Sequence, residues 1–168
     1  MFKFLKKKNK CSIVKQSLQS MEDLWTISDK HEFMSAMYDR IDCKCSSGTN
    51  LEDLSDPERV IYINMLFEEE VNNGGFDQFF YNSSGDFYEE VMECLLEVGA
   101  EITASIYRQA MSALGRHIPK DRNERQELLD SLDQEILENK LNKCDDDFWD
   151  CEESLEELNY QFMMRHKQ

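Results

Sequence analysis

Carboxylate side chains recur at intervals of three or four residues in two parts of the sequence. A helix turns through ~100° per residue, so acids at these intervals would lie along one side of it, within roughly 60° of one another. The chemistry that they offer is ionic, because a line of negative charges can bind the lysines and arginines of a basic protein. We call the two sets the first acidic row (Asp86, Glu90, Glu93, Glu97 and Glu101) and the second acidic row (Asp146, Asp150, Glu153 and Glu157).

The spacing within these rows is comparable with that of phosphates in duplex DNA. Steps of three or four helical residues rise about 4.5 to 6 Å, and duplex DNA places a phosphate every ~3.4 Å of axis along each strand. The rows are therefore predicted to bind a basic protein that itself binds nucleic acid. The alternative is a pair of solvated helix faces, because acids four residues apart are common there although they repel by about 0.2–0.5 kcal/mol.

Cysteine and histidine side chains offer a second kind of chemistry, metal binding. Cys43 and Cys45 lie near His31 in the sequence, and Cys144 and Cys151 are seven residues apart. Neither pair has the two-residue gap that is typical of a zinc knuckle, and the sequence has no HExxH motif. We therefore predict no metal site and no cofactor. A small zinc-binding or ligand-binding helical protein is kept as an alternative of a different class.

The remaining histidines do not indicate catalysis. His117 and His166 lie beside the ends of predicted helices, and no nucleophile accompanies them. The sequence shows no export signal, so its six cysteines are expected to be reduced. We therefore predict a cytoplasmic protein that is not an enzyme and has no catalytic residues.

The segment NNGGFDQFFYNSSGD, residues 72–86, concentrates aromatic residues between glycines. Phe76, Phe79 and Phe80 are spaced so that one short helical turn directs all three into a core. Amide and hydroxyl side chains around them favour turns, and the amides are expected to satisfy exposed backbone groups. A polar ligand pocket is the alternative, but the segment has no nucleophile, histidine or basic group. We predict a structural plug made of Asn73, Gly74, Gly75, Phe76, Gln78, Phe79, Phe80, Asn82, Gly85 and Asp86.

Charge is distributed unevenly along the chain, whose net charge is −16. Six of the nineteen basic residues lie in the first fifteen positions, which hold no acid, and the other thirteen accompany all thirty-five acids. We predict a basic, mobile N-terminal tail over residues 1–20 and an acidic α-helical domain over 21–168. Such a domain repels nucleic acid and attracts basic proteins.

Hydrophobic spacing predicts helices almost everywhere, and therefore an all-α fold: a single compact domain of about six to eight helices. The clearest start is at Asp56 and Pro57, and Gly74 and Gly75 end that helix. The other expected helices are 29–42 with Ser28 as N-cap, 86–99 with Asp86 and Glu89 spaced as a capping box, 100–114, 122–141, and a last one from about 146 with Asp145, Asp146 and Asp147 at its N-terminus. Expected core residues include Phe33, Met34, Met37, Ile41, Ile63, Phe67, Val71, Val91, Leu95, Val98, Ile102, Ile106, Leu129 and Ile136.

Two segments resemble a known family. EEEVNNGGFDQFFYNSSGD followed by LLEVGA resembles the signature of the bacterial DNA-mimic-protein-nineteen family, and CDDDFWDCEESLEELNYQF is similar to its C-terminal pattern. The resemblance covers residues 20–165. It implies a dimeric α-helical protein, whose best-studied relative imitates DNA and occupies the DNA-binding surface of a transcription factor. No binding residue is carried over, because surface carboxylates can mimic DNA without matching position by position.

Charge and resemblance together predict an acidic, DNA-mimic-like module that binds a basic protein and competes with nucleic acid for it. The expected partner is a nucleic-acid-binding protein such as a transcription factor. Direct binding of nucleic acid and a membrane span are not expected, and the resemblance implies a homodimer. The alternatives are an immunity or antitoxin protein that blocks a basic nuclease toxin, and a stabilising domain without mimicry.

Overall fold

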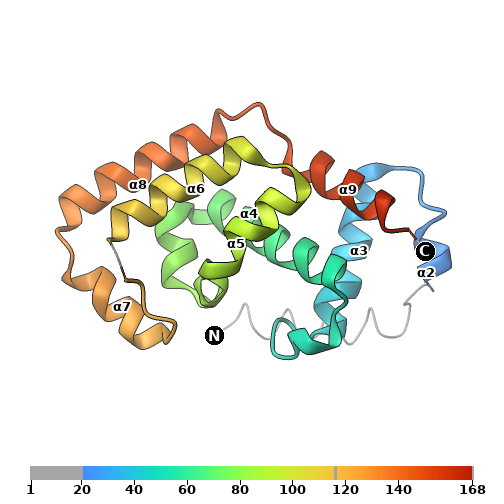
Figure 1. Cartoon of the computed structure of the whole chain (residues 1–168), viewed down its shortest axis with the longest axis horizontal. Coiled ribbons are helices and arrows are strands. Elements are labelled where there is room, and N and C mark those ends of the chain that lie inside the picture. Colours follow the sequence, from blue (N-terminus) through green and yellow to red (C-terminus); the bar gives the residue numbers. More distant parts are fainter. Residues whose placement is uncertain (1–20, 116, 168) are drawn as a thin grey trace. The chain divides into compact units, whose positions relative to one another are not determined.

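The computed structural model describes residues 21–115 and 117–167 (Figure 1). The predicted basic tail, residues 1–20, lies outside this part of the chain. All regular elements of the described residues are helical, eight of them α-helices, which confirms the all-α prediction. They are α2 (Met21–Leu24), α3 (Lys30–Lys44), the 3-10 helix η1 (Leu51–Asp53), α4 (Asp56–Tyr81), the 3-10 helix η2 (Ser83–Phe87), α5 (Tyr88–Val98), α6 (Glu101–Leu114), α7 (Arg122–Ser131), α8 (Gln134–Trp149) and α9 (Leu155–Arg165).

The described residues form two compact units. The first comprises residues 21–62 and 160–167, and the second comprises residues 63–159. Both boundaries fall inside helices, so α4 and α9 each contribute residues to both units. Within residues 21–115 and 117–167, no helix has both the length and the apolar composition that are needed to span a bilayer.

The first unit is organised around α3. This helix begins after Asp29, whose side chain accepts the N–H of Glu32 at 2.8 Å, so Asp29 replaces the predicted Ser28 as N-cap. The Phe33 ring packs against Trp25 and Tyr160, with centroids 5.2 and 5.5 Å away. The predicted core residues Phe33, Met34, Met37 and Ile41 are all buried.

The start of α4 lies in the same unit. Ser55 donates its backbone N–H and its hydroxyl to Glu58, both at 2.9 Å, and Lys44 pairs with the same carboxylate at 2.6 Å. The carbonyl of Ser55 accepts the N–H of Arg59, so Ser55 occupies the capping position expected for Asp56. Burial alone would raise the pKa of Glu58, but Lys44 and Ser55 hold it below its usual value.

In the second unit, Gly74 and Gly75 interrupt α4 at the predicted place. Gly75 has a φ of 75°, and a Cβ on it would lie 2.5 Å from Oδ2 of Asp145, so a glycine is required on both grounds. Beyond the interruption, Phe76, Phe79 and Phe80 are at most 1% exposed, as expected for a plug.

The plug is part of a larger aromatic core in the second unit. Phe67 contacts the rings of Phe76 and Phe79 with centroids 5.8 and 5.3 Å away, and Tyr107 and Phe148 lie 5.4 and 5.8 Å from it. Tyr107 donates its hydroxyl to the carbonyl of Tyr88 at 2.6 Å. Three separate parts of the chain therefore meet in one core, which α6 and α8 cover side by side (Figure 1).

Three predicted helix boundaries in the second unit are wrong. The helix expected from 86 begins at Tyr88, after η2, although it ends at the left-handed Gly99 as predicted. The helix expected over 122–141 is two helices, because Asp133 accepts the N–H of Ile136 and starts α8. The helix expected from about 146 begins at Leu155 instead.

α8 continues past residue 146 because its apolar face continues. Leu137, Leu141, Cys144 and Phe148 follow one another at steps of four, three and four residues, and the first three are buried. Two expected core residues are instead on the surface: Ile102 on α6 is 56% exposed and Ile136 on α8 is 54% exposed.

Candidate functional site

In the first acidic row, Asp86 forms ion pairs within the fold, although its side chain is 37% exposed. Its Oδ1 accepts from Nη2 of Arg125 at 2.5 Å, and its Oδ2 accepts from Nη2 of Arg122 at 2.7 Å. Partial burial would raise the pKa of Asp86, but the two arginines hold it below its usual range. The charge of Asp86 is therefore neutralised within the protein.

The other members of the first row remain on the surface of α5 and α6. Glu93 and Glu97 are exposed on α5, Glu90 is half-buried beside them, and Glu101 is exposed in the first turn of α6. Arg108 of α6 reaches α5 and donates to Sδ of Met92 at 3.8 Å, which brings a positive charge to the same surface. These carboxylates therefore face solvent, with a cation nearby.

The second acidic row is divided by the end of α8. Asp146 lies in the last turn of this helix and Asp150 is its C-cap, so the two are not in the same helix as Glu157 of α9. Glu153 lies in the connection and accepts the N–H groups of Ile102 at 3.1 Å and Thr103 at 2.9 Å. Glu153 thus caps α6 and is engaged within the fold.

The structure places Asp145, Asp146 and Asp147 near the C-terminus of α8. The sequence had instead predicted them at the N-terminus of a helix. Asp145 is buried, and its Oδ1 accepts the N–H of Phe76 at 2.8 Å. Burial, followed by the charges of Asp146 and Asp77, raises the pKa of Asp145. Acids at this end oppose the helix dipole, so the fold tolerates an unfavourable placement of negative charge.

The tertiary structure creates an acidic cluster that the spacing does not show. It consists of Asp77 after the interruption in α4, Asp130 on α7 and Glu138 on α8, all of them exposed. Partial burial and then the charges of Glu138 and Asp130 raise the pKa of Asp77, so both of these carboxylates lie within electrostatic reach of Asp77. Among the described residues, none of the three forms an ion pair with a lysine or arginine.

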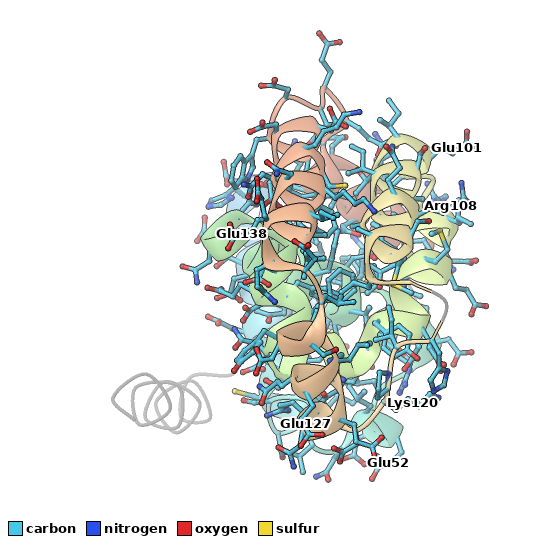
Figure 2. All side chains as sticks on the ribbon, turned by 90° about the vertical axis from the view of Figure 1, so that its left-hand side faces the viewer. Glu52, Glu101, Arg108, Lys120, Glu127 and Glu138 are labelled. Carbon is cyan, nitrogen blue, oxygen red and sulfur yellow. The ribbon has the colours of Figure 1, made fainter. Side chains whose placement is uncertain are left out.

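Lysines on α8 do not neutralise this acidic cluster. Lys140 and Lys143 are exposed, but at ~100° per residue they lie ~160° and ~140° around the helix from Glu138. Figure 2 shows Glu138 on α8 and Glu127 on α7 projecting from the surface, with Glu101 and Arg108 along α6. The negative charge on the Glu138 side of α8 is thus uncompensated within the described residues.

Arg125 holds the plug in place, a role that its position in the sequence does not indicate. Its side chain is 0% exposed, and it donates to the carbonyl groups of Phe80 at 2.7 Å, Asn82 at 3.1 Å and Lys120 at 3.0 Å, in addition to Asp86. Gly85 leaves room for it, because a Cβ there would lie 3.0 Å from Nε of Arg125.

The amides of the plug act differently from the prediction. Gln78 and Asn82 both donate to Oε2 of Glu70 at 2.9 Å, and do not satisfy the backbone of the segment. That backbone is satisfied by Arg125, by Asp145 and by the hydroxyl of Ser84, which donates to the carbonyl of Phe79 at 3.0 Å.

The candidate metal ligands are not brought together. Cys43, Cys45 and Cys144 are buried free thiols, and burial raises the pKa of both Cys45 and Cys144. Cys151 follows the end of α8, so it does not share a helix face with Cys144. Within the described residues, no group of three or more His, Cys, Asp or Glu side chains is arranged to hold a metal ion.

These observations define an all-α protein whose second unit carries exposed, uncompensated carboxylates. The family model of DMP19-like proteins matches residues 52–166, and the chain belongs to this family. Comparisons with curated proteins and with solved structures found no match.

Proposed function

We propose that this protein is an acidic binding module that occludes the nucleic-acid-binding surface of a basic partner protein. Membership of the DMP19-like family is consistent with a protein partner. The module acts by binding, and it carries out no reaction of its own. When the partner binds nucleic acid, its basic side chains neutralise phosphates. When it binds this protein, the same side chains neutralise Asp and Glu side chains.

The observation that carries this proposal is the acidic cluster of Asp77, Asp130 and Glu138. These carboxylates lie on three separate elements. Partial burial is the largest cause that raises the pKa of Asp77, and the charges of Glu138 and Asp130 are the next. Like charges held close destabilise a fold, so this arrangement favours a role in binding over a role in stability. Glu93, Glu97 and Glu101 extend the exposed negative charge and have no ion pair with another described residue.

Such an interface predicts association that is steered by charge and weakened by salt. Exposed charges are screened over about 8 Å at physiological ionic strength, so binding is expected to fall steeply as salt rises. Duplex DNA should compete, because the partner uses the same basic surface for both.

The test is capture of partners on the immobilised protein at about 50 mM and 500 mM salt, with identification of the captured proteins. We expect a basic nucleic-acid-binding protein at low salt only, released by a short DNA duplex. The triple variant D77N/D130N/E138Q should capture at least about tenfold less of it.

A matched control removes the same charge from the first unit. Glu22, Glu52 and Asp53 are exposed there, and the variant E22Q/E52Q/D53N should retain most of the capture. Partners that are indifferent to salt and to duplex DNA, or an equal loss in both triple variants, would contradict the proposal. Capture of a nuclease would identify the partner class as a toxin.

A further inference from the structure

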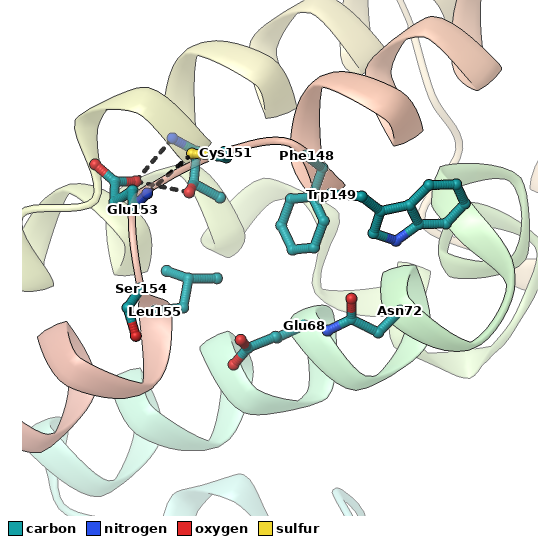
Figure 3. A pocket seen from close by; sticks show the side chains of 9 residues that line it. Glu68, Asn72, Phe148, Trp149, Cys151, Glu153, Ser154 and Leu155 are labelled. Carbon is teal, nitrogen blue, oxygen red and sulfur yellow. Dashed lines mark hydrogen bonds between the residues drawn. The ribbon is translucent and has the colours of Figure 1, made fainter.

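The second unit contains a pocket apart from the acidic cluster. Its volume is about 190 Å³, and α4, the end of α8 and the connection to α9 line it (Figure 3). Glu68 and Asn72 project into it from α4, and Phe148, Trp149 and Leu155 form its other side. The pocket therefore combines carboxylates, at Glu68 and Glu153, with aromatic and aliphatic side chains.

Glu68 is a carboxylate without a cation. It is half-buried, and among the described residues no lysine, arginine or hydrogen-bond donor pairs with it. Burial, and then the charge of Glu156, raise the pKa of Glu68 to about 7. An ionised Glu68 is thus disfavoured in the free protein, and a cation that enters the pocket would recover this free energy.

The other acid that lines the pocket is already engaged. Glu153 accepts two N–H groups and the hydroxyl of Thr103, at 2.6 Å, at the start of α6 (Figure 3). Asn72 is exposed and lies beside Glu68, where its amide oxygen can accept a further hydrogen bond. A cationic donor would therefore meet Glu68 and Asn72 together.

Trp149 gives the pocket an apolar entrance. Its side chain is 54% exposed, an unusual placement for the largest apolar side chain, and exposed tryptophans commonly anchor interfaces. In Figure 3, Glu68 lies on the lower side of the pocket, and Phe148 and Trp149 lie above it toward the right. A ligand that contacts both Glu68 and Trp149 must have a charged end and an apolar stem.

We propose that this pocket receives an alkylguanidinium or alkylammonium group, with the cation at Glu68 and the methylene stem along Phe148 and Trp149. The inference rests on the proposed function where it takes the ligand to be an arginine or lysine side chain of the basic partner. A free small organic cation has the same chemistry, and the experiment below distinguishes the two sources.

Binding should be linked to the ionisation of Glu68. A cation selects the ionised carboxylate, so affinity should fall by about 10- to 100-fold between pH 8 and pH 5, as Glu68 with its pKa of about 7 takes up a proton. The other titratable groups that face Glu68 are Glu156, Glu153 and Cys151. Their contribution is separated from that of Glu68 by the variants below.

The probe is N-acetyl-arginine methylamide, titrated into the full chain at low salt, with its uncharged isostere N-acetyl-citrulline methylamide as control. Binding is followed by calorimetry and by fluorescence, in a W25F background that leaves Trp149 as the reporter, since the chain has two tryptophans. We expect the arginine compound to bind at pH 8 and change Trp149 emission, and the citrulline compound to do neither.

Two neighbouring variants make the test specific. Glu68→Gln keeps the shape of the side chain and should weaken binding of the arginine compound at least about tenfold. Glu69→Gln removes an exposed charge from the next position of α4, outside the pocket, and should leave binding unchanged. Absence of binding, equal binding of the citrulline compound, or equal losses in the two variants would overturn the inference.

Partner capture then identifies the source of the cation. If Glu68→Gln reduces capture of the basic partner, the ligand is a side chain of that partner. If Glu68→Gln leaves capture unchanged but still weakens binding of the arginine compound, the ligand is a free cation. Failure of the compound to bind, with salt-sensitive capture intact, rejects the pocket alone. Binding of the compound without any basic partner rejects the proposed function alone.

Discussion

Arg125 carries a guanidinium group into the interior of the second unit, where solvent cannot compensate it. Its charge is balanced by Asp86, and its remaining donors are satisfied by the carbonyl groups of Phe80, Asn82 and Lys120. A buried charge is tolerated only with such complete pairing. The residue therefore connects α7 to the end of the plug.

Removal of this side chain should strongly destabilise the protein. Arg125→Met leaves Asp86 with one cation and removes the Arg125 donors from the carbonyl groups of Phe80, Asn82 and Lys120, and should lower the free energy of unfolding by about 3–5 kcal/mol. Arg122→Met removes the exposed partner of the same carboxylate and should cost about 1 kcal/mol or less. Urea unfolding of both variants checks this, and equal losses would show that Arg125 has no special role.

Glu68 makes stability depend on pH. Its pKa is raised from 4.5 to about 7 in the folded protein, so its favourable contribution is complete below pH 4.5 and is lost as the pH rises through 7. Glu68→Gln should therefore raise the free energy of unfolding by about 1–3 kcal/mol at pH 8 and have almost no effect at pH 4. Urea unfolding at several pH values measures this. A stabilisation that is independent of pH would contradict the assignment to Glu68.

At the scale of elements, the connection between α8 and α9 does more than join them. Glu153 satisfies two N–H groups at the start of α6 that have no partner within that helix. Ser154 accepts the N–H of Glu157 at 3.2 Å and so starts α9. These adjacent residues cap two different helices, which explains why the second acidic row cannot form one continuous surface.

Loss of the Glu153 cap should loosen α6. Glu153→Gln removes the charge that favours the N-terminus of this helix, and should lower the free energy of unfolding by about 0.5–2 kcal/mol. Glu152→Gln changes an exposed neighbour and should have an effect within about 0.5 kcal/mol. Hydrogen exchange at the N–H groups of Ile102 and Thr103 should increase in the first variant only. Unchanged exchange at both groups would contradict the capping role.

For the molecule as a whole, the dominant electrostatic feature is excess negative charge. The net charge of −16 becomes more negative over the described residues, because six of the nineteen basic residues lie before residue 16. The acidic cluster and the acids at the end of α8 add repulsion that the fold does not relieve. Self-repulsion of this kind lowers the stability of a compact state and is weakened by salt.

Salt should consequently stabilise this protein. Between about 50 mM and 500 mM NaCl we expect the thermal midpoint to rise by about 2–8 °C, corresponding to about 1–2 kcal/mol. The variant D77N/D130N/E138Q should begin with a higher midpoint and rise less, whereas E22Q/E52Q/D53N should rise more nearly as the parent does. Calorimetry at several salt concentrations tests this. A midpoint that is independent of salt would show that the charges do not repel effectively.

Much of the fold could be predicted from the sequence because its signals are local. The apolar spacing of α3, α4 and α5, the glycines at 74, 75 and 99, and the burial of Phe76, Phe79 and Phe80 all follow from the helical period and from glycine conformations. The start of α9 had a similar signal, Ser154 followed three residues later by Glu157, which the acidic spacing obscured.

The sequence by itself determined an all-α, strongly acidic protein with a buried aromatic plug, because composition and helical periodicity are properties of neighbouring residues. Only the tertiary structure decided which acids are free: Asp86 is paired with Arg122 and Arg125, Glu153 caps α6, and Asp77 lies within electrostatic reach of Asp130 and Glu138. These outcomes depend on contacts between residues about 36 to 61 positions apart, and no helical period specifies such contacts.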